Sequence, residues 1–377
     1  DLFGSSETLQ TIRLAETVKR IVSPDHLTER PIEPAVAAGM AELRKADSPR
    51  AVLVQEIKAL LRDPNGDISL EDLVKDVVRP IRSALNDPEK FPTSLPSTIT
   101  NSRPEFARYF IKQIQEYDKV LEPAFRLIQL GAMYGLGRHE PIWTRLVQDL
   151  AATAQQNSGN TALLALRGYP LVVTAHIASM AAIARDNYGA LRAFVADPEA
   201  RTINGKIPVV LDSGPRKVVS EVQWIPSALV ISEDKGVEAD DDLIEGLLKG
   251  SIGKRHTPIS DHIYRLLMPL FEDYVGDENE YAEVFDRAEV FMDLIAADAA
   301  AVNADQYWGW RGGYGRYTWK YMRAKNPPEK ALSAAFEASP DGWSPLLDGV
   351  FGGSTERTMA AFAEVISGAE TVRQNQW

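Results

Sequence analysis

The sequence predicts a mainly α-helical protein, a bundle or array of many helices with a small β insertion near residues 201–233. Three observations predict this fold class. Apolar residues recur at three- and four-residue spacing over most of the chain. Helix start and stop signals separate these periodic segments, and short β-branched runs gather in one place. Hydrophobic residues make up 45% of the chain, which is enough for a sizeable core.

The first 90 residues are expected to form an N-terminal helical segment. Four helices are expected there, beginning at Ser6, Pro34, Ser48 and Ser69. Ser48 followed by Pro49 suits a helix cap and a first helical position. Ser69 followed three residues later by Asp72 is a variant of the capping box. Pro80 is expected to kink or end the fourth helix, because proline cannot donate the backbone hydrogen bond.

Residues 87–104 are expected to be a loop and a domain boundary, because they contain prolines at positions 88, 92, 96 and 104. A central helical bundle is then expected over residues 104–200. Its helices are predicted at 104–133, 141–154, 161–184 and 188–196.

The pattern changes at Arg201, where short β-branched runs replace the helical spacing. Strands are predicted at 206–211, 217–224 and 228–232, with Asp212–Pro215 as a hairpin turn between the first two. The small β insertion is therefore expected to span residues 201–235.

A C-terminal helical region is expected over residues 236–377, with helices at 260–275 and 280–303. The second of these helices has the clearest periodicity in the chain, and its stripe consists of Phe285, Ala288, Met292, Ile295, Ala299 and Val302. Glu283, Asp286 and Asp293 fall on another side of this helix.

Composition argues against several kinds of site. The net charge of −12 provides no basic face at the level of the whole chain, as a duplex nucleic-acid binder needs. The chain has no cysteine, which excludes thiolate ligands and thiol nucleophiles. The five histidines show no HExxH spacing. We therefore expect no metal and no cofactor.

The chain is expected to be cytoplasmic and to have no membrane partner. The best apolar run, Leu171–Ala184, contains fourteen residues and is interrupted by His176. A membrane-spanning helix needs about 20 apolar residues. The first residues lack an initiator methionine and a signal-peptide pattern. We read this as a sign of truncation or trimming, which leaves a missing upstream domain as an open alternative.

Two further patterns have ordinary explanations. Gly250–Arg255 differs from a phosphate-binding loop in its glycine spacing and has Arg255 where a magnesium-binding hydroxyl is needed. The acidic clusters at 240–245 and 273–283 lack calcium-loop spacing. Carboxylates also favour helix starts. A hydrolase that uses a pair of carboxylates stays open, but no particular pair is selected.

The most unusual segment is 307–325, where aromatic and basic residues alternate without an acid. The candidate ligand-binding residues are Trp308, Trp310, Arg311, Tyr314, Arg316, Tyr317, Trp319 and Lys320. Aromatic faces with interleaved arginines suit stacked bases, nucleotides or sugars. The alternative is an aromatic plug between helices, with arginines paired to the preceding acidic helix. Either way, Arg311 or Arg316 is expected near carboxylates of residues 272–298.

Two stretches carry a resemblance. Ala162–Pro170, running on to Asp186–Leu191, and Val284–Met292 with Gly315–Trp319 resemble the helical C-terminal regions of large bacterial proteins. Proteins of that kind often carry a separate N-terminal effector or nucleic-acid-binding domain, and some look like defence proteins. The resemblance implies a regulatory or recognition region and supplies no catalytic residues.

Three functions follow from these observations. The leading hypothesis is a non-catalytic helical region that regulates, senses or assembles a larger bacterial protein. Its partner would be another protein, a covalently linked upstream domain or a second copy of the chain. The alternatives are a protein that binds nucleotides, nucleic acid or glycans through residues 307–325, and a hydrolase with a carboxylate-based site.

Overall fold

The computed structural model describes residues 49–97, 99, 102–155, 158–202, 205–211, 214–219, 222–305 and 315–374. Residues 57–377 form one compact unit, and residues 1–56 form another. The described residues of the smaller unit, 49–56, belong to helix α3 (Pro49–Arg62). The helices predicted to begin at Ser6 and Pro34 lie outside the described residues.

The prediction of a mainly helical fold is confirmed. After α3 the chain continues with α4 (Asp67–Leu85), α5 (Arg103–Tyr134), α6 (Glu140–Ala154), α7 (Thr161–Leu166), α8 (Tyr169–Ile183) and α9 (Tyr188–Leu191). Ser102 caps α5, because its hydroxyl accepts a hydrogen bond from the backbone N–H of Glu105 at 3.4 Å. A π-helical turn, Arg192–Ala196, follows α9.

Of the two expectations for Pro80, a kink or an end of the helix, the second is wrong, because α4 continues for five residues beyond it. The buried face of α4 consists of Leu70, Val74, Val78, Ile81 and Leu85, and it extends across the proline. Burial of Ile81 and Leu85 favours continued helix enough to offset the one hydrogen bond that Pro80 cannot donate.

Helix α8 lies at the centre of the unit, and all its residues from Tyr169 to Ile183 are buried. The apolar stretch Thr161–Ile183 reaches the length and hydropathy of a membrane-crossing helix. It is longer than Leu171–Ala184, the apolar run considered from the sequence alone. In the most apolar 18-residue part of this stretch, 78% is buried inside the protein, so its apolar surface is used in packing.

The β insertion is smaller than predicted and begins slightly earlier. Strand β1 (Glu199–Thr202) pairs antiparallel with β2 (Gly205–Pro208), and Glu199 lies opposite Pro208. The strand predicted at 206–211 is right for 206–208, which belong to β2, and wrong for 209–211; no described residue of the strand predicted at 217–224 lies in a strand. In their place are 3₁₀ turns η4 (Val209–Leu211) and η5 (Lys217–Val219). Their valines are buried, so these β-branched runs reflect burial and not strand pairing.

The strand predicted at 228–232 is also wrong, because these residues lie within helix α10 (Trp224–Lys235). Residues Ile225 to Val230 are buried in sequence, so the segment shows no strand-like alternation of buried and exposed positions. The remaining helices are α11 (Asp241–Lys249), α12 (Pro258–Phe271), α13 (Glu278–Val302), α14 (Arg316–Lys320), α15 (Pro328–Ala338), α16 (Ser344–Leu347) and α17 (Thr355–Gln374).

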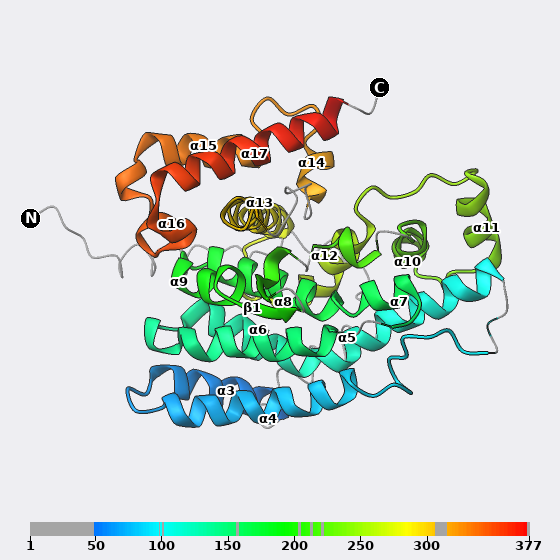
Figure 1. The fold of residues 1–377 in the computed structure, drawn as a ribbon, viewed down its shortest axis with the longest axis horizontal. Helices are drawn as coiled ribbons and strands as arrows, with labels where there is room; N and C mark the ends of the chain where they lie inside the picture. The colour runs from blue at the N-terminus through cyan, green and yellow to red at the C-terminus, as the bar shows by residue number, and fades with distance from the viewer. Residues whose placement is uncertain are drawn as a thin grey trace, which may run out of the picture. The chain divides into compact units, whose positions relative to one another are not determined.

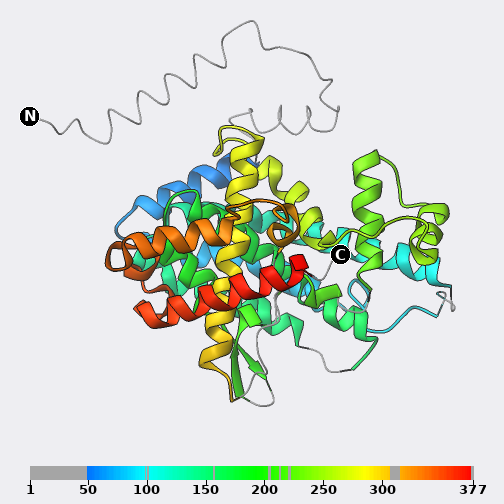
Figure 2. The same ribbon diagram turned by 90° about the horizontal axis from the view of Figure 1, so that it is seen from above.

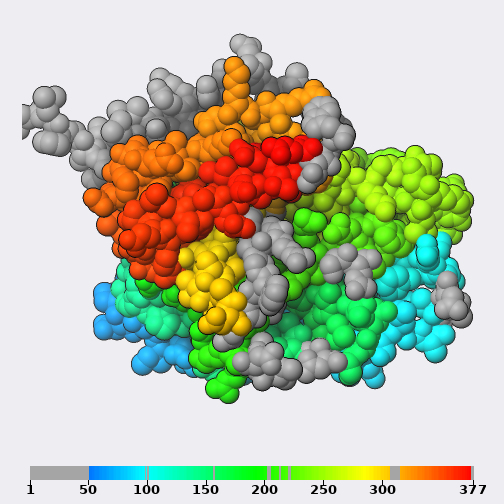
Figure 3. All heavy atoms as spheres, turned by 45° about the horizontal axis from the view of Figure 1, so that its top comes forward, coloured from blue at the N-terminus to red at the C-terminus, as the bar shows by residue number. Residues whose placement is uncertain are grey.

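Helix α13 is the central element of the C-terminal part. It packs against α8 on one side and against α15 and α17 on the other (Figure 1). Seen from above, α13 crosses beneath α15 and α17, which run side by side (Figure 2). The space-filling view shows α17 lying across α13, whose C-terminal end remains visible beside it (Figure 3). Helices predicted in separate regions, 104–200 and 236–377, therefore pack together within one unit.

Burial on both sides explains why α13 departs from a simple amphipathic helix. The predicted stripe is buried at Phe285, Ala288, Met292 and Ile295, but Val302 at the helix end is 58% exposed. Asp286 and Asp293, predicted on another side, are each 1% exposed. Buried carboxylates require polar partners, and these partners define the candidate site.

Replacing Asp277 with alanine is expected to lower the free energy of unfolding by about 1 kcal/mol. Its carboxylate caps α13 by accepting hydrogen bonds from the backbone N–H groups of Asn279, at 2.8 Å, and Glu280, at 2.9 Å. Urea unfolding measures the loss, and Asp273→Ala, an exposed aspartate outside a helix cap, is the control. An equal loss in both variants would contradict a capping role.

Candidate functional site

The predicted ligand-binding residues divide into two groups. Trp308, Trp310, Arg311 and Tyr314 lie outside the described residues. Arg316, Tyr317, Trp319 and Lys320 lie on the short helix α14, which packs against α13 and α17.

Three buried carboxylates of α13 hold α14 in place. Asp286 accepts a hydrogen bond from Nζ of Lys320 at 2.5 Å, and its Oδ1 lies 3.7 Å from Nε of Arg316. Asp293 accepts a hydrogen bond from the hydroxyl of Tyr317 at 2.8 Å. The prediction that Arg316 lies near carboxylates of residues 272–298 is therefore confirmed.

Glu289 is the third of these carboxylates and is fully buried. It accepts hydrogen bonds from the hydroxyl of Ser260 and, at 3.3 Å, from the backbone N–H of Tyr317. His176 lies 3.7 Å away through Nε2. Burial raises the pKa of Glu289 and outweighs the opposing effects of His176 and Ser260. Through these neighbours, Glu289 of α13 links α8, α12 and α14.

The aromatic rings around α14 stack on side chains of the protein itself. The Arg316 guanidinium lies over the ring of Tyr264, 3.9 Å from its centroid. The indole of Trp319 stacks on the imidazole of His256, with centroids 3.6 Å apart and planes inclined by 8°. Tyr317 is fully buried. For this part of the segment, the geometry matches the aromatic plug that the sequence suggested as one alternative.

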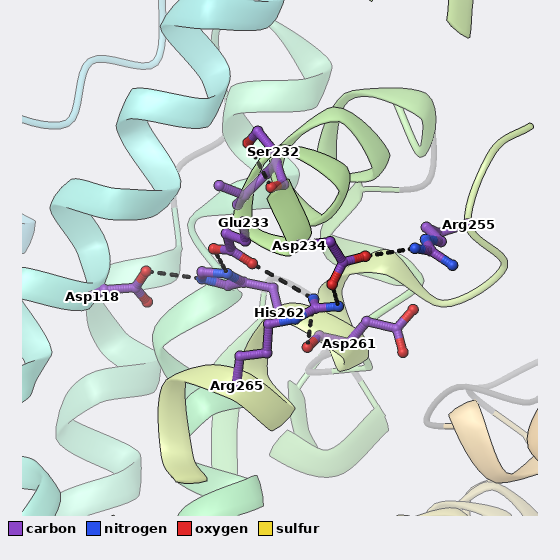
Figure 4. Close-up of polar contacts among 9 residues, drawn as sticks. Asp118, Ser232, Glu233, Asp234, Arg255, Asp261, His262 and Arg265 are labelled. Carbon is purple, nitrogen blue, oxygen red and sulfur yellow. Dashed lines mark hydrogen bonds and ion pairs between the residues drawn. The ribbon is translucent and has the colours of Figure 1, made fainter. Parts of the chain in front are cut away.

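A second cluster, centred on His262, was not predicted from the sequence. His262 on α12 lies between two carboxylates: Nδ1 is 2.7 Å from Oε1 of Glu233, and Nε2 is 2.9 Å from Oδ2 of Asp118. Asp118 comes from α5 and Glu233 from the end of α10, so the imidazole links three helices (Figure 4). Tyr169 of α8 donates a further hydrogen bond to Oδ1 of Asp118 at 2.6 Å.

Ion pairs extend this His262 cluster toward the surface. Arg265 lies 3.6 Å from Glu233 and 2.5 Å from Asp234, which also accepts a hydrogen bond from Arg255 at 2.6 Å. Figure 4 shows Arg255 arriving from the loop before α12, while Asp261 and Arg265 come from α12 itself. The cluster thus passes from the buried imidazole of His262 through the half-buried Arg265 to the exposed Arg255.

His262 is held in its charged form. Burial alone would lower its pKa, but the hydrogen bonds and charges of Asp118 and Glu233 outweigh burial and raise the pKa to about 9. Both ring nitrogens of an imidazolium are donors, which suits an acceptor on each side. An imidazole that carries its proton at neutral pH cannot serve as a general base there.

The charged imidazole predicts a specific dependence of stability on pH. An unfolded histidine has a pKa of about 6.5, so the contribution of His262 is fully present below that pH. The contribution is lost as the pH rises through about 9. The free energy of unfolding should fall by about 3 kcal/mol across this range.

Urea unfolding of the protein and of His262→Gln at several pH values tests this prediction. The fall with rising pH should be smaller in the variant, because glutamine does not titrate. The same pH dependence in both proteins would contradict a charged His262.

An open groove lies between α4 and α6, with a volume of about 890 Å³. Val74, Val78 and Leu146 are among the residues that line it. Four cations and four carboxylates are among its lining residues, and Asp149 lies 3.5 Å from Arg82 and 3.4 Å from Arg145. The charges therefore offset one another, and the groove selects neither an anion nor a cation. Within the described ranges, no three His, Asp or Glu side chains are grouped to hold a metal ion.

The sequence contains little signal for the His262 cluster. His262 is separated from Asp118 by 144 positions and from Glu233 by 29. Neither spacing belongs to a local motif, and Glu233 was expected at the end of a β insertion.

The comparisons with known proteins give no further guide. No protein-family model matches the chain, and neither the curated proteins nor the solved structures contain a match.

Proposed function

We propose that this chain is a non-catalytic helical region that regulates, senses or assembles a larger bacterial protein. The observation that carries the proposal is that the buried ionisable groups form contacts between helices. His262, Glu289 and Asp286 contact side chains or backbone of other helices, and Glu289 and Asp286 lie in the core. A catalytic group must reach a substrate, whereas these groups join helices.

Ion pairs between the C-terminal helices support the same proposal. Arg357 of α17 donates two hydrogen bonds to Asp298 of α13, at 2.8 and 2.6 Å. Arg373 at the end of α17 donates one to the buried Glu329 of α15, at 2.5 Å. Paired charges with well-defined geometry fix the relative position of helices, which suits a rigid surface for protein recognition.

The partner proposed is a second copy of the chain or a linked upstream domain, and the setting proposed is the cytoplasm. A membrane partner is not proposed, because the longest apolar stretch is used in the core. The resemblance to C-terminal regions of defence-type bacterial proteins is consistent with this proposal.

Two measurements on the whole chain test the proposal. Light scattering after size exclusion should give a mass above 41.6 kDa if the chain assembles with itself. Incubation with nucleotides, phosphodiesters and glycosides should give no turnover. Turnover that disappears in Glu289→Gln or His262→Gln would contradict the proposal and support the hydrolase alternative. A monomer without turnover would leave the linked domain as the proposed partner.

A further inference from the structure

Two basic segments that are far apart in the sequence meet where the rings of His256 and Trp319 stack. His256 lies in the loop before α12, next to Lys254 and Arg255, while Trp319 lies on α14. The imidazole and indole rings are nearly parallel, with centroids 3.6 Å apart. His256 is exposed and Trp319 is half-buried. The stack therefore places the loop before α12 and helix α14 on one surface.

Not all cations near this stack are already engaged. Arg255 is paired with Asp234, and Arg316 and Lys320 are paired with Asp286. Arg216 and Lys254 are exposed and form no ion pair with any described residue.

The two unpaired cations are neighbours of His256, one in space and the other in sequence. Arg216 lines the same small hollow as His256, and Lys254 precedes His256 by two positions. This surface, the His256 surface, consists of Arg216, Lys254, His256 and Trp319.

The chemistry of the His256 surface favours a ligand that has both a flat ring and a negative charge. An exposed imidazole supported from behind by an indole is a platform on which a base stacks. Unpaired arginine and lysine bind phosphate oxygens. A sugar ring would use the aromatic face but would not need the two cations. Duplex nucleic acid is disfavoured, because its bases are already stacked and the chain carries a net charge of −12.

We propose that the His256 surface binds single-stranded nucleic acid, with a base stacked on His256 and backbone phosphates bound by Arg216 and Lys254. This activity goes beyond the proposed assembly role and does not depend on it. The binding residues all belong to the described part of the chain.

Fluorescence anisotropy of a labelled oligothymidylate of about 15 nucleotides, a length that such surfaces accommodate, tests the proposal. Titration with the whole chain at low salt should give saturable binding. Binding should weaken as salt rises from about 50 to about 200 mM, because phosphate contacts release counterions. His256→Ala should weaken binding about tenfold through the lost stack.

The double variant Arg216→Glu/Lys254→Glu should weaken binding more strongly than His256→Ala. Its matched control is Lys75→Glu/Arg79→Glu on α4, which changes the net charge equally at exposed positions. The control should bind like the original protein. Thermal melts of all variants establish that they are folded, which exposed charge changes should permit. The proposal would be overturned if the original protein did not bind the oligothymidylate, or if the two double variants lost binding affinity equally.

Discussion

Replacing Arg167 with methionine is expected to lower the free energy of unfolding by about 3–5 kcal/mol, because buried carbonyl groups would lose their donors. The Arg167 side chain is 4% exposed. It donates to the carbonyl of Thr153 at 3.1 and 2.6 Å, to that of Leu85 at 2.9 Å and to that of Phe91 at 3.3 Å. Leu85 and Thr153 lie at the C-terminal ends of α4 and α6, so one guanidinium caps two helices.

Urea unfolding followed by circular dichroism measures this effect. Arg138→Met is the matched control, because Arg138 also donates to backbone carbonyls, at 3.4 Å to Leu61 and 3.1 Å to Asp63. Arg138 is exposed, so water can replace it, and a loss below about 1 kcal/mol is expected. Similar losses in the two variants would show that burial of the carbonyls at Arg167 is not the cause.

Replacing Trp143 with alanine is also expected to cost about 3–5 kcal/mol, through loss of a large buried side chain. Trp143 is fully buried on α6, and its ring stacks on Phe194 with centroids 5.3 Å apart. It also lies against Gly131 and Gly135 of the α5 end, where an added Cβ would approach the indole to 2.7 and 2.8 Å. These glycines leave the space that the indole fills.

The neighbouring Ile142 provides the control for Trp143. It is half-buried at the α4–α6 groove, and Ile142→Ala should cost clearly less than Trp143→Ala. Gly131→Ala should destabilise the original protein by about 1–3 kcal/mol, because its methyl group would press on the indole. The same change should cost less when Trp143 is already alanine. Additive effects of the two substitutions would contradict their contact.

The His262 and Glu289 clusters show how perturbed ionisable groups can serve structure. A perturbed pKa is often a sign of a catalytic site, but paired networks between helices perturb pKa values in the same way. The direction of the pKa shift at each group follows from its surroundings. Two carboxylates raise the pKa of His262 and keep it charged, while burial raises the pKa of Glu289 and favours its neutral form. The enclosed position of these groups favours the structural role.

Sequence by itself determined the helical architecture and several helix starts. Apolar spacing and capping residues are local properties, because they depend on side chains within about one helical turn. The helices expected to begin at 161 and 188 do begin at Thr161 and Tyr188, whereas the helix expected to begin at Ser69 begins at Asp67. The acidic stretch before the aromatic–basic segment also predicted the pairing of Arg316, since opposite charges in neighbouring segments attract one another.

Only the tertiary structure decided which segments are surrounded by others. It made the apolar run Ile225–Val230 a buried helical face, because packing on several sides removes the periodic signal that separates helix from strand. It also brought Asp118, Glu233 and His262 together and stacked His256 on Trp319. These contacts depend on how whole helices pack, and local sequence spacing does not encode the relative positions of helices.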